Sequence, residues 1–232
     1  YLFFNKKEPL DAAQGEPIKI GAVYPLTGPA APIGEQIRNG AVLAVEDINK
    51  KGGVKGRKIE LIIEDGQSDP KASISALNKL VDTNSIKLAL TGLSRVALSL
   101  IPLADEKKIL LMVNASHPEI TGTSQFVLRH AVIADESAEI LVSSVKDRNS
   151  KFISVLALND DYALAFQKAI RSLTNKYNPN TQIVFEDKFN KEETDFKTMI
   201  SKVIIRNPEA VYIIGFGNPI GILIKQFREL GY

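Results

Sequence analysis

The segment between residues 18 and 69 constrains the fold of this chain more than any other part of its sequence. It holds an apolar run at 18–24, a loop rich in glycine and proline, a helix-like stretch and a second apolar run at 58–64. Within the helix-like stretch, apolar residues recur from position 33 to 48 with the spacing of one helix face, and Gly52 and Gly53 end it. We therefore predict a strand–helix–strand unit. Its first loop lies at the carboxyl end of the first strand, where open α/β sheets bind their ligands.

The same alternation continues to the end of the chain. Asp69 followed by Pro70 is typical of a helix start, with an N-cap residue ahead of a proline in the first turn. Strands alternating with helices predict parallel sheets with helices on both faces. The further predicted strands are 86–90, 109–113, 126–128, 152–158, 181–185 and 210–214, and the further helices cover 96–104, 135–145, 162–173, 194–205 and a last stretch to 230.

A seam near residues 129–135 divides this pattern into two similar blocks. We predict an α/β protein of two doubly wound parallel-sheet lobes joined by a hinge, the first at 18–131 and the second at 132–232. Residues 1–17 are predicted to be an anchor stub and a polar linker, because the apolar residues 1–4 precede Asn5, Lys6 and Lys7. A disordered terminus is the alternative for these first residues.

The composition excludes several functions. The 232 residues carry a net charge of +2, with 29 basic and 27 acidic residues interleaved, so the clustered charge typical of nucleic-acid binding is missing. No cysteine occurs, which excludes disulfides and thiolate chemistry. The loop at 25–34 lacks the glycine spacing of a dinucleotide site, and the segment 64–69 lacks that of a calcium loop. We predict a protein without catalytic activity, cofactor or metal, and we expect the charged run at 188–193 to be solvated surface.

Three stretches carry a family resemblance: LTGPAAPIG at 26–34, RNGAVLAVEDINKKGGVKGRKIEL at 38–61 and EDGQSDP at 64–70. In this order they closely resemble the type I periplasmic binding proteins that serve branched-chain amino acid ABC transporters. The resemblance implies that a small carboxylate-bearing ligand, a branched-chain or other apolar amino acid, binds between the lobes and is delivered to a membrane permease. It also implies a monomer in the periplasm or another extracytoplasmic space, anchored if residues before 5 are an anchor. Family members continue well beyond this chain, so we expect the second lobe to be truncated here.

Part of the binding site can be predicted on the first lobe. The loop at 91–95 follows a strand and opens a helix, so its N–H groups suit a carboxylate. Ser94 aligns with the carboxylate-binding serine of the resembled family, although a plain helix N-cap is the alternative. The resemblance also places Asn114, Ala115 and Ser116 at the ligand's carboxylate and ammonium groups, whereas ordinary turn chemistry would equally explain Asn and Ser there.

The second lobe is expected to close over the ligand with aromatic side chains. The resemblance assigns this role to Tyr162, for which a half-buried helix tyrosine is the alternative, and to Phe216, where the family often has tyrosine. Arg95 stands where serine is usual; it either adds a second carboxylate clamp or extends into solvent. Ile33 replaces a common aromatic residue of the pocket. The family's acidic residue for the ammonium group lies beyond residue 232.

A second function stays open at this point. The same scaffold serves signalling as well as transport, so the chain is alternatively the ligand-sensing domain of a membrane receptor or regulator. A sensor would continue into a membrane helix or an output domain, whereas a transport protein would end after its two lobes.

Overall fold

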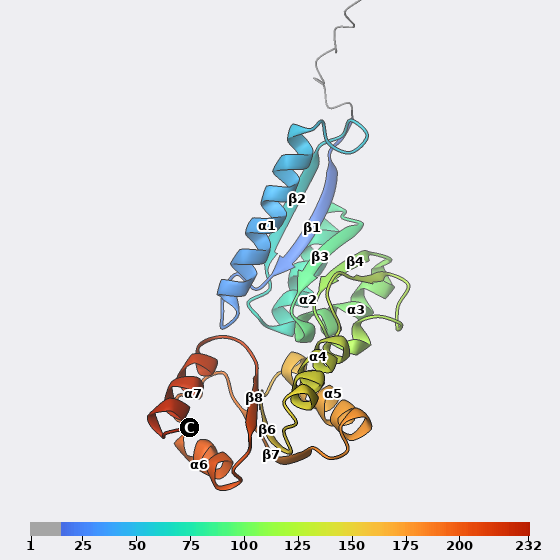
Figure 1. The fold of residues 1–232 in the computed structure, drawn as a ribbon. Coiled ribbons are helices and arrows are strands. Elements are labelled where there is room, and N and C mark those ends of the chain that lie inside the picture. The colour runs from blue at the N-terminus through green and yellow to red at the C-terminus, as the bar shows by residue number, and fades with distance from the viewer. Residues whose placement is uncertain (1–14) are drawn as a thin grey trace, which may run out of the picture.

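The computed structural model describes residues 15–232 and arranges them around two parallel sheets (Figure 1). The first sheet has five strands in the order β2-β1-β3-β4-β5, and the second has three in the order β7-β6-β8. Every registered strand pair in both sheets is parallel. The predicted parallel α/β fold is therefore confirmed. We call the first sheet with its helices the first lobe, and the second sheet with its helices the second lobe.

In the first lobe, α1 flanks β1 and β2 while α2 and α3 pack together against the sheet (Figure 1). The buried core between α2, α3 and the sheet includes Leu77, Leu100 and Leu111, each fully buried. The elements of this lobe are β1 (Ile18–Tyr24), α1 (Ala31–Lys50), β2 (Ile59–Asp65), α2 (Pro70–Asn84), β3 (Leu88–Gly92), α3 (Ser94–Lys107), β4 (Leu110–Asn114), the 3-10 turn η1 (Pro118–Ile120) and β5 (Val127–Arg129).

The second lobe repeats the strand–helix alternation around its own core. Fully buried Phe189 and Phe196 pack edge to face within it, with ring centroids 5.6 Å apart. Its elements are α4 (Ala134–Asp147), β6 (Phe152–Leu158), α5 (Asp161–Tyr177), β7 (Gln182–Phe189), α6 (Lys197–Ile205), β8 (Ala210–Ile214) and α7 (Asn218–Glu229).

Local chemistry explains several element boundaries. The Asp69 carboxylate accepts a hydrogen bond of 2.9 Å from the N–H of Ala72, so the predicted N-cap of α2 is confirmed. Several boundaries differ from the prediction by one to four residues. β7 runs to Phe189 rather than 185, and α6 begins at Lys197 rather than 194. Phe196, at the N-cap position of α6, is fully buried in the core.

The predicted anchor stub lies outside the described residues, and the division of the lobes at residues 131 and 132 stays a prediction. None of the helices within residues 15–232 combines the length and the apolar character needed to cross a membrane.

Candidate ligand-binding site

The two sheets direct their topological switch points toward each other. In the first sheet the strand order reverses between β1 and β3, and in the second it reverses between β6 and β8. Open α/β sheets bind ligands outside the carboxyl ends of the strands at such points. The loops that follow these four strands line two adjoining cavities between the lobes.

The first cavity, which we call the apolar cavity, has a volume of about 320 Å³. Ile33, Ile37 and Leu93 supply apolar surface from the first lobe. Polar groups from the ends of β3 and β4 and aromatic rings from the second lobe complete its wall. Six of the residues predicted for the site line this cavity together: Ser94, Asn114, Ala115, Ser116, Tyr162 and Phe216.

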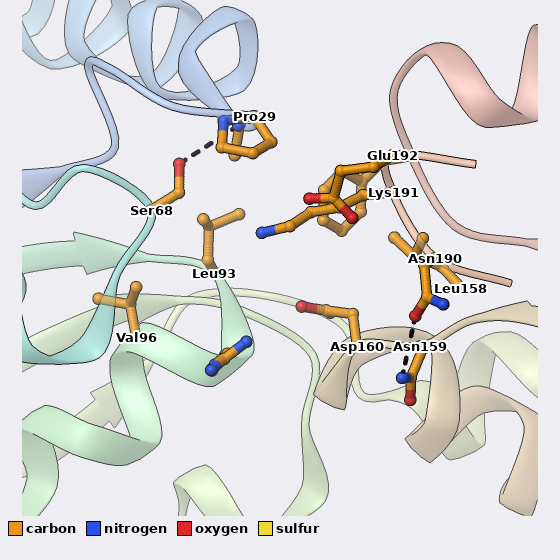
Figure 2. Close-up of a pocket in the computed structure, with 13 residues that line it drawn as sticks. Pro29, Ser68, Leu93, Val96, Leu158, Asn159, Asp160, Asn190, Lys191 and Glu192 are labelled. Atoms are coloured by element: carbon orange, nitrogen blue, oxygen red, sulfur yellow. Dashed lines mark hydrogen bonds between the residues drawn. The ribbon is translucent and has the colours of Figure 1, made fainter. Parts of the chain in front are cut away.

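The second cavity, which we call the polar cavity, has a volume of about 220 Å³ and shares Leu93, Asp160 and Phe216 with the apolar one. Figure 2 shows Lys191 extending its ammonium group from the second lobe toward Leu93 of the first. The expectation that the charged run at 188–193 is solvated surface is confirmed for Lys188, Lys191 and Glu192, which are exposed, and Lys191 also lines the space between the lobes. Arg95, the seventh predicted residue, is also exposed, and it lines the polar cavity rather than the apolar one.

Ser94 occupies the amino end of α3 with its hydroxyl group unused. It is the first helical residue, and the N-cap position belongs to Leu93, so the interpretation of Ser94 as an N-cap is wrong. Among the described residues, no side chain caps the amino end of this helix with a hydrogen bond. The Ser94 residue is only 2% exposed, and its Oγ has no hydrogen-bond partner within the described part of the chain. A buried hydroxyl without a partner is costly, so this group is available for a ligand.

The backbone just before Ser94 is in an unusual conformation. Leu93 has a φ of 66° and a ψ of 129°, a region that residues other than glycine rarely adopt. Such backbone strain persists only where the surrounding structure enforces it, and it is concentrated at functional sites. Leu93 and Ser94, at the amino end of α3, line the apolar cavity.

The amino end of α5 faces the same space but carries its own cap. Asp160 is the N-cap residue, and its side chain accepts a hydrogen bond of 2.9 Å from the N–H of Tyr162. Tyr162 packs against Phe166 and Phe216, with ring centroids 5.5 and 6.3 Å away. Burial raises the pKa of the Tyr162 phenol, and the Asp160 charge adds to the rise, so the hydroxyl is a neutral donor at physiological pH.

Asp65, at the end of β2, holds the loop that borders the polar cavity. Its carboxylate accepts hydrogen bonds from the N–H groups of Leu26 at 2.9 Å, Thr27 at 3.2 Å and Gln67 at 2.8 Å, and from the Thr27 hydroxyl at 2.6 Å. Burial alone would raise the pKa of Asp65, but these bonds outweigh it and hold the pKa below its usual value. The residue is thus a structural clamp for the loop after β1.

Replacing Asp65 with alanine is expected to lower the free energy of unfolding by about 1–2 kcal/mol at neutral pH, because four donors lose a charged acceptor. A folded-state pKa below the unfolded one stabilises the protein above the unfolded pKa, and this stabilisation is lost as pH falls through the folded value. The difference between wild type and Asp65→Ala in urea unfolding should therefore shrink on acidification. Asp47→Ala, at an exposed position on α1, serves as the control; a pH-independent difference would contradict the clamp.

Sequence reasoning missed the position of two charged residues in the cleft. Asp160 caps α5 and also lines both cavities. Its place directly after β6, at the switch point of the second sheet, is the signal that could have revealed it. Lys191 follows β7, and no sequence pattern distinguishes it from a surface lysine. Across residues 15–232, no group of three or more His, Asp or Glu side chains is placed to hold a metal ion.

Comparison with known proteins identifies the family of this chain. The family model of the periplasmic binding proteins matches residues 17–232, which is nearly the whole chain. The chain belongs to the periplasmic binding protein family. Members of this family are non-enzymatic binding proteins, so the prediction of a protein without catalytic activity is confirmed.

Individual relatives agree with this assignment. The periplasmic binding protein described here is 31% identical over 228 residues to the Leu/Ile/Val-binding protein of Escherichia coli (strain K12), covering 94% of this chain and 60% of that protein. It thus spans less than two thirds of this relative's length. Among solved structures, a branched-chain amino acid transporter substrate-binding protein from Streptococcus pneumoniae in complex with isoleucine superimposes with a TM-score of 0.85. It is 24% identical, and the match covers 93% of this chain and 62% of that one.

A further structure shows a different kind of ligand. A solute-binding protein of an ABC transporter from Rhodopseudomonas palustris BisB5, in complex with 3,4-dihydroxybenzoic acid, is 25% identical with a TM-score of 0.82. The match covers 92% of this periplasmic binding protein and 58% of that chain. Both bound ligands, isoleucine and the aromatic acid, carry a carboxylate.

Proposed function

We propose that this protein is the solute-binding component of an ABC transporter, which captures a branched-chain or other apolar amino acid between its lobes and delivers it to a membrane permease. It acts in the periplasm or another extracytoplasmic space. The proposal rests on family membership and on the character of the cleft. The names and bound ligands of its relatives, Leu/Ile/Val and isoleucine, point to the same class.

One observation carries the proposal: the buried, unpartnered Ser94 hydroxyl at the uncapped amino end of α3. The helix dipole and free N–H groups at such an end favour an anion. A ligand carboxylate would accept a charge-assisted hydrogen bond from Ser94 Oγ and satisfy a group that is otherwise buried without a partner. Asn114, Ala115 and Ser116, at and after the carboxyl end of β4, would hold the adjoining polar atoms of the ligand.

The remaining walls match an apolar side chain. Ile33, Ile37 and Leu93 would contact it from the first lobe, and the rings of Tyr162 and Phe216 would cover it from the second. Contacts with both lobes favour the closed arrangement, because a ligand shifts a conformational equilibrium only through contacts that differ between the states. Arg95 would approach the ligand from the polar cavity, where it would meet a second carboxylate if the ligand had one.

A thermal-shift screen of the purified protein tests this function. A ligand that binds only the folded state stabilises it by about 2.7 kcal/mol at a hundred times its dissociation constant. We expect leucine, isoleucine or valine to raise the melting temperature in a concentration-dependent way, and D-leucine to raise it far less. If a dicarboxylate such as glutarate were the only active compound, Arg95 would become the main anchor. If 3,4-dihydroxybenzoate alone were active, the ligand class would be aromatic acids.

A further inference from the structure

We propose that Arg129 is a positioning residue for ligand binding, because its guanidinium group holds the turn after β4 and so fixes residues 114–116, which line the apolar cavity. The inference rests on the proposed function, since it concerns the same site. Arg129 is not among the described residues that line either cavity. It would therefore act on the ligand only through the segment that it holds.

The backbone at Arg129 fixes the start of this segment. Arg129 is the last residue of β5, and it pairs with Val113 of β4 in the parallel ladder. The next residue, His130, donates a backbone hydrogen bond of 2.8 Å to the carbonyl of Val113. β4 is therefore held by β5 immediately before Asn114, its last residue.

The Arg129 side chain fixes the other end of the segment. Its Nη1 donates a hydrogen bond of 3.0 Å to the carbonyl of His117, and its Nη2 donates one of 2.9 Å to the hydroxyl of Thr121. These two acceptors flank η1, whose Ile120 is fully buried in the core of the first lobe. The planar guanidinium group presents its donors in a rigid fork, so one side chain holds both ends of the turn in a fixed geometry.

Residues 114–116 lie between these two fixed points, with Val113 before them and His117 after them. The carbonyl of Ser116 also accepts a hydrogen bond of 2.9 Å from the N–H of Ala134, the first residue of α4 in the second lobe. A short segment that is fixed at both ends has few conformations left. Its polar groups are therefore ordered before a ligand arrives, and little further ordering is needed on binding.

The charge of Arg129 is not explained by an ion pair. Within residues 15–232, no carboxylate oxygen lies within 4.0 Å of its guanidinium group. The half-buried side chain instead donates to a carbonyl and a hydroxyl, both of them neutral acceptors in the turn. Hydrogen bonds from a charged donor are stronger than those between neutral groups, so the turn is held firmly.

Amide hydrogen exchange without ligand and calorimetric titration with L-leucine test this role on wild type, Arg129→Met and Arg129→Lys. Methionine donates no hydrogen bond, whereas lysine keeps the charge but lacks the fork. In Arg129→Met, the N–H groups of Ile120 and Ala134, which donate to the carbonyls of His117 and Ser116, should exchange at least about tenfold faster. The dissociation constant for leucine should rise about tenfold, because the segment must then be ordered on binding. Arg129→Lys should show a smaller change in both quantities.

A second variant separates the position of the turn from the charge of Arg129. Thr121→Val removes one acceptor of the guanidinium group and leaves the positive charge in place. It should raise the dissociation constant for leucine about threefold. Combined with Arg129→Met it should add little, since both changes remove the same bond. Arg148→Met, at the exposed C-cap position of α4, is the control and should change neither exchange nor affinity.

Urea unfolding establishes that each variant is folded under the conditions of the titration. Wild-type leucine affinity in a folded Arg129→Met variant would overturn the inference, and so would unchanged exchange at Ile120 and Ala134. If Arg129→Met does not fold, Arg129→Lys and Thr121→Val decide by the same two measurements. Wild type that binds no amino acid would overturn the proposed function, whereas the exchange measurement needs no ligand and tests the hold of Arg129 on the turn independently.

Discussion

Replacing Ser94 with alanine is expected to weaken amino acid binding by about 1.5–3 kcal/mol, which is roughly a 10- to 150-fold rise in dissociation constant. The variant removes a hydroxyl donor that would bind the ligand carboxylate through a charge-assisted bond. Fold stability should change little, because the hydroxyl is buried without a partner in the absence of ligand. Ser94→Ala should therefore lower the affinity for the ligand while leaving the free energy of unfolding nearly unchanged.

Calorimetric titration with L-leucine and urea unfolding measure these two quantities. Ser99→Ala is the matched control, since Ser99 lies on the same helix but donates its hydroxyl proton to the carbonyl of Val96 at 2.7 Å and lines neither cavity. It should leave leucine affinity unchanged. An unchanged dissociation constant for Ser94→Ala would remove Ser94 from the site, and a large loss of stability would show that its hydroxyl has a structural role.

Much of the fold follows from local sequence signals. β1, β6 and β8 begin and end at the predicted residues, because each is a short apolar run bounded by turn or polar residues. A helix start was predictable where a cap residue precedes it, as Asp69 precedes α2. The start of α6 was not predicted correctly, because the residue at its N-cap position is the buried Phe196, which is not a residue type that marks helix starts.

The site was predictable only in part. Residue types and the family resemblance placed Ser94, Ser116 and Tyr162 together, and they do line one cavity. The positive φ of Leu93, which shifts the N-cap position away from Ser94, has no signal in a leucine side chain. The meeting of Arg95 and Asp160 in the polar cavity depends on how the two lobes face each other. No local sequence pattern predicts that arrangement, so the charged residues of the polar cavity could be identified only from the structure.

Replacing Phe196 with alanine is expected to cost about 3–5 kcal/mol of unfolding free energy, the largest effect predicted for this protein. The ring is fully buried and packs edge to face on Phe189 at a centroid distance of 5.6 Å. Its backbone N–H also donates a 2.7 Å hydrogen bond to the side chain of Gln226 on α7. Truncation therefore leaves a cavity where β7, α6 and α7 meet, and well-packed cores fill such cavities only partially.

Urea unfolding followed by far-ultraviolet circular dichroism measures this cost. Phe152→Ala is the matched control, because Phe152 starts β6 with 41% of its surface exposed and should lose far less stability. Phe196→Leu should fall between the two, since it keeps most of the apolar volume. A loss below about 1 kcal/mol for Phe196→Ala would contradict a tightly packed second lobe.

Phe189 is the last residue of β7, and the loop that follows it carries Lys191 into the polar cavity. The same core contact therefore supports one wall of the cleft, and Phe196→Ala should also weaken ligand binding.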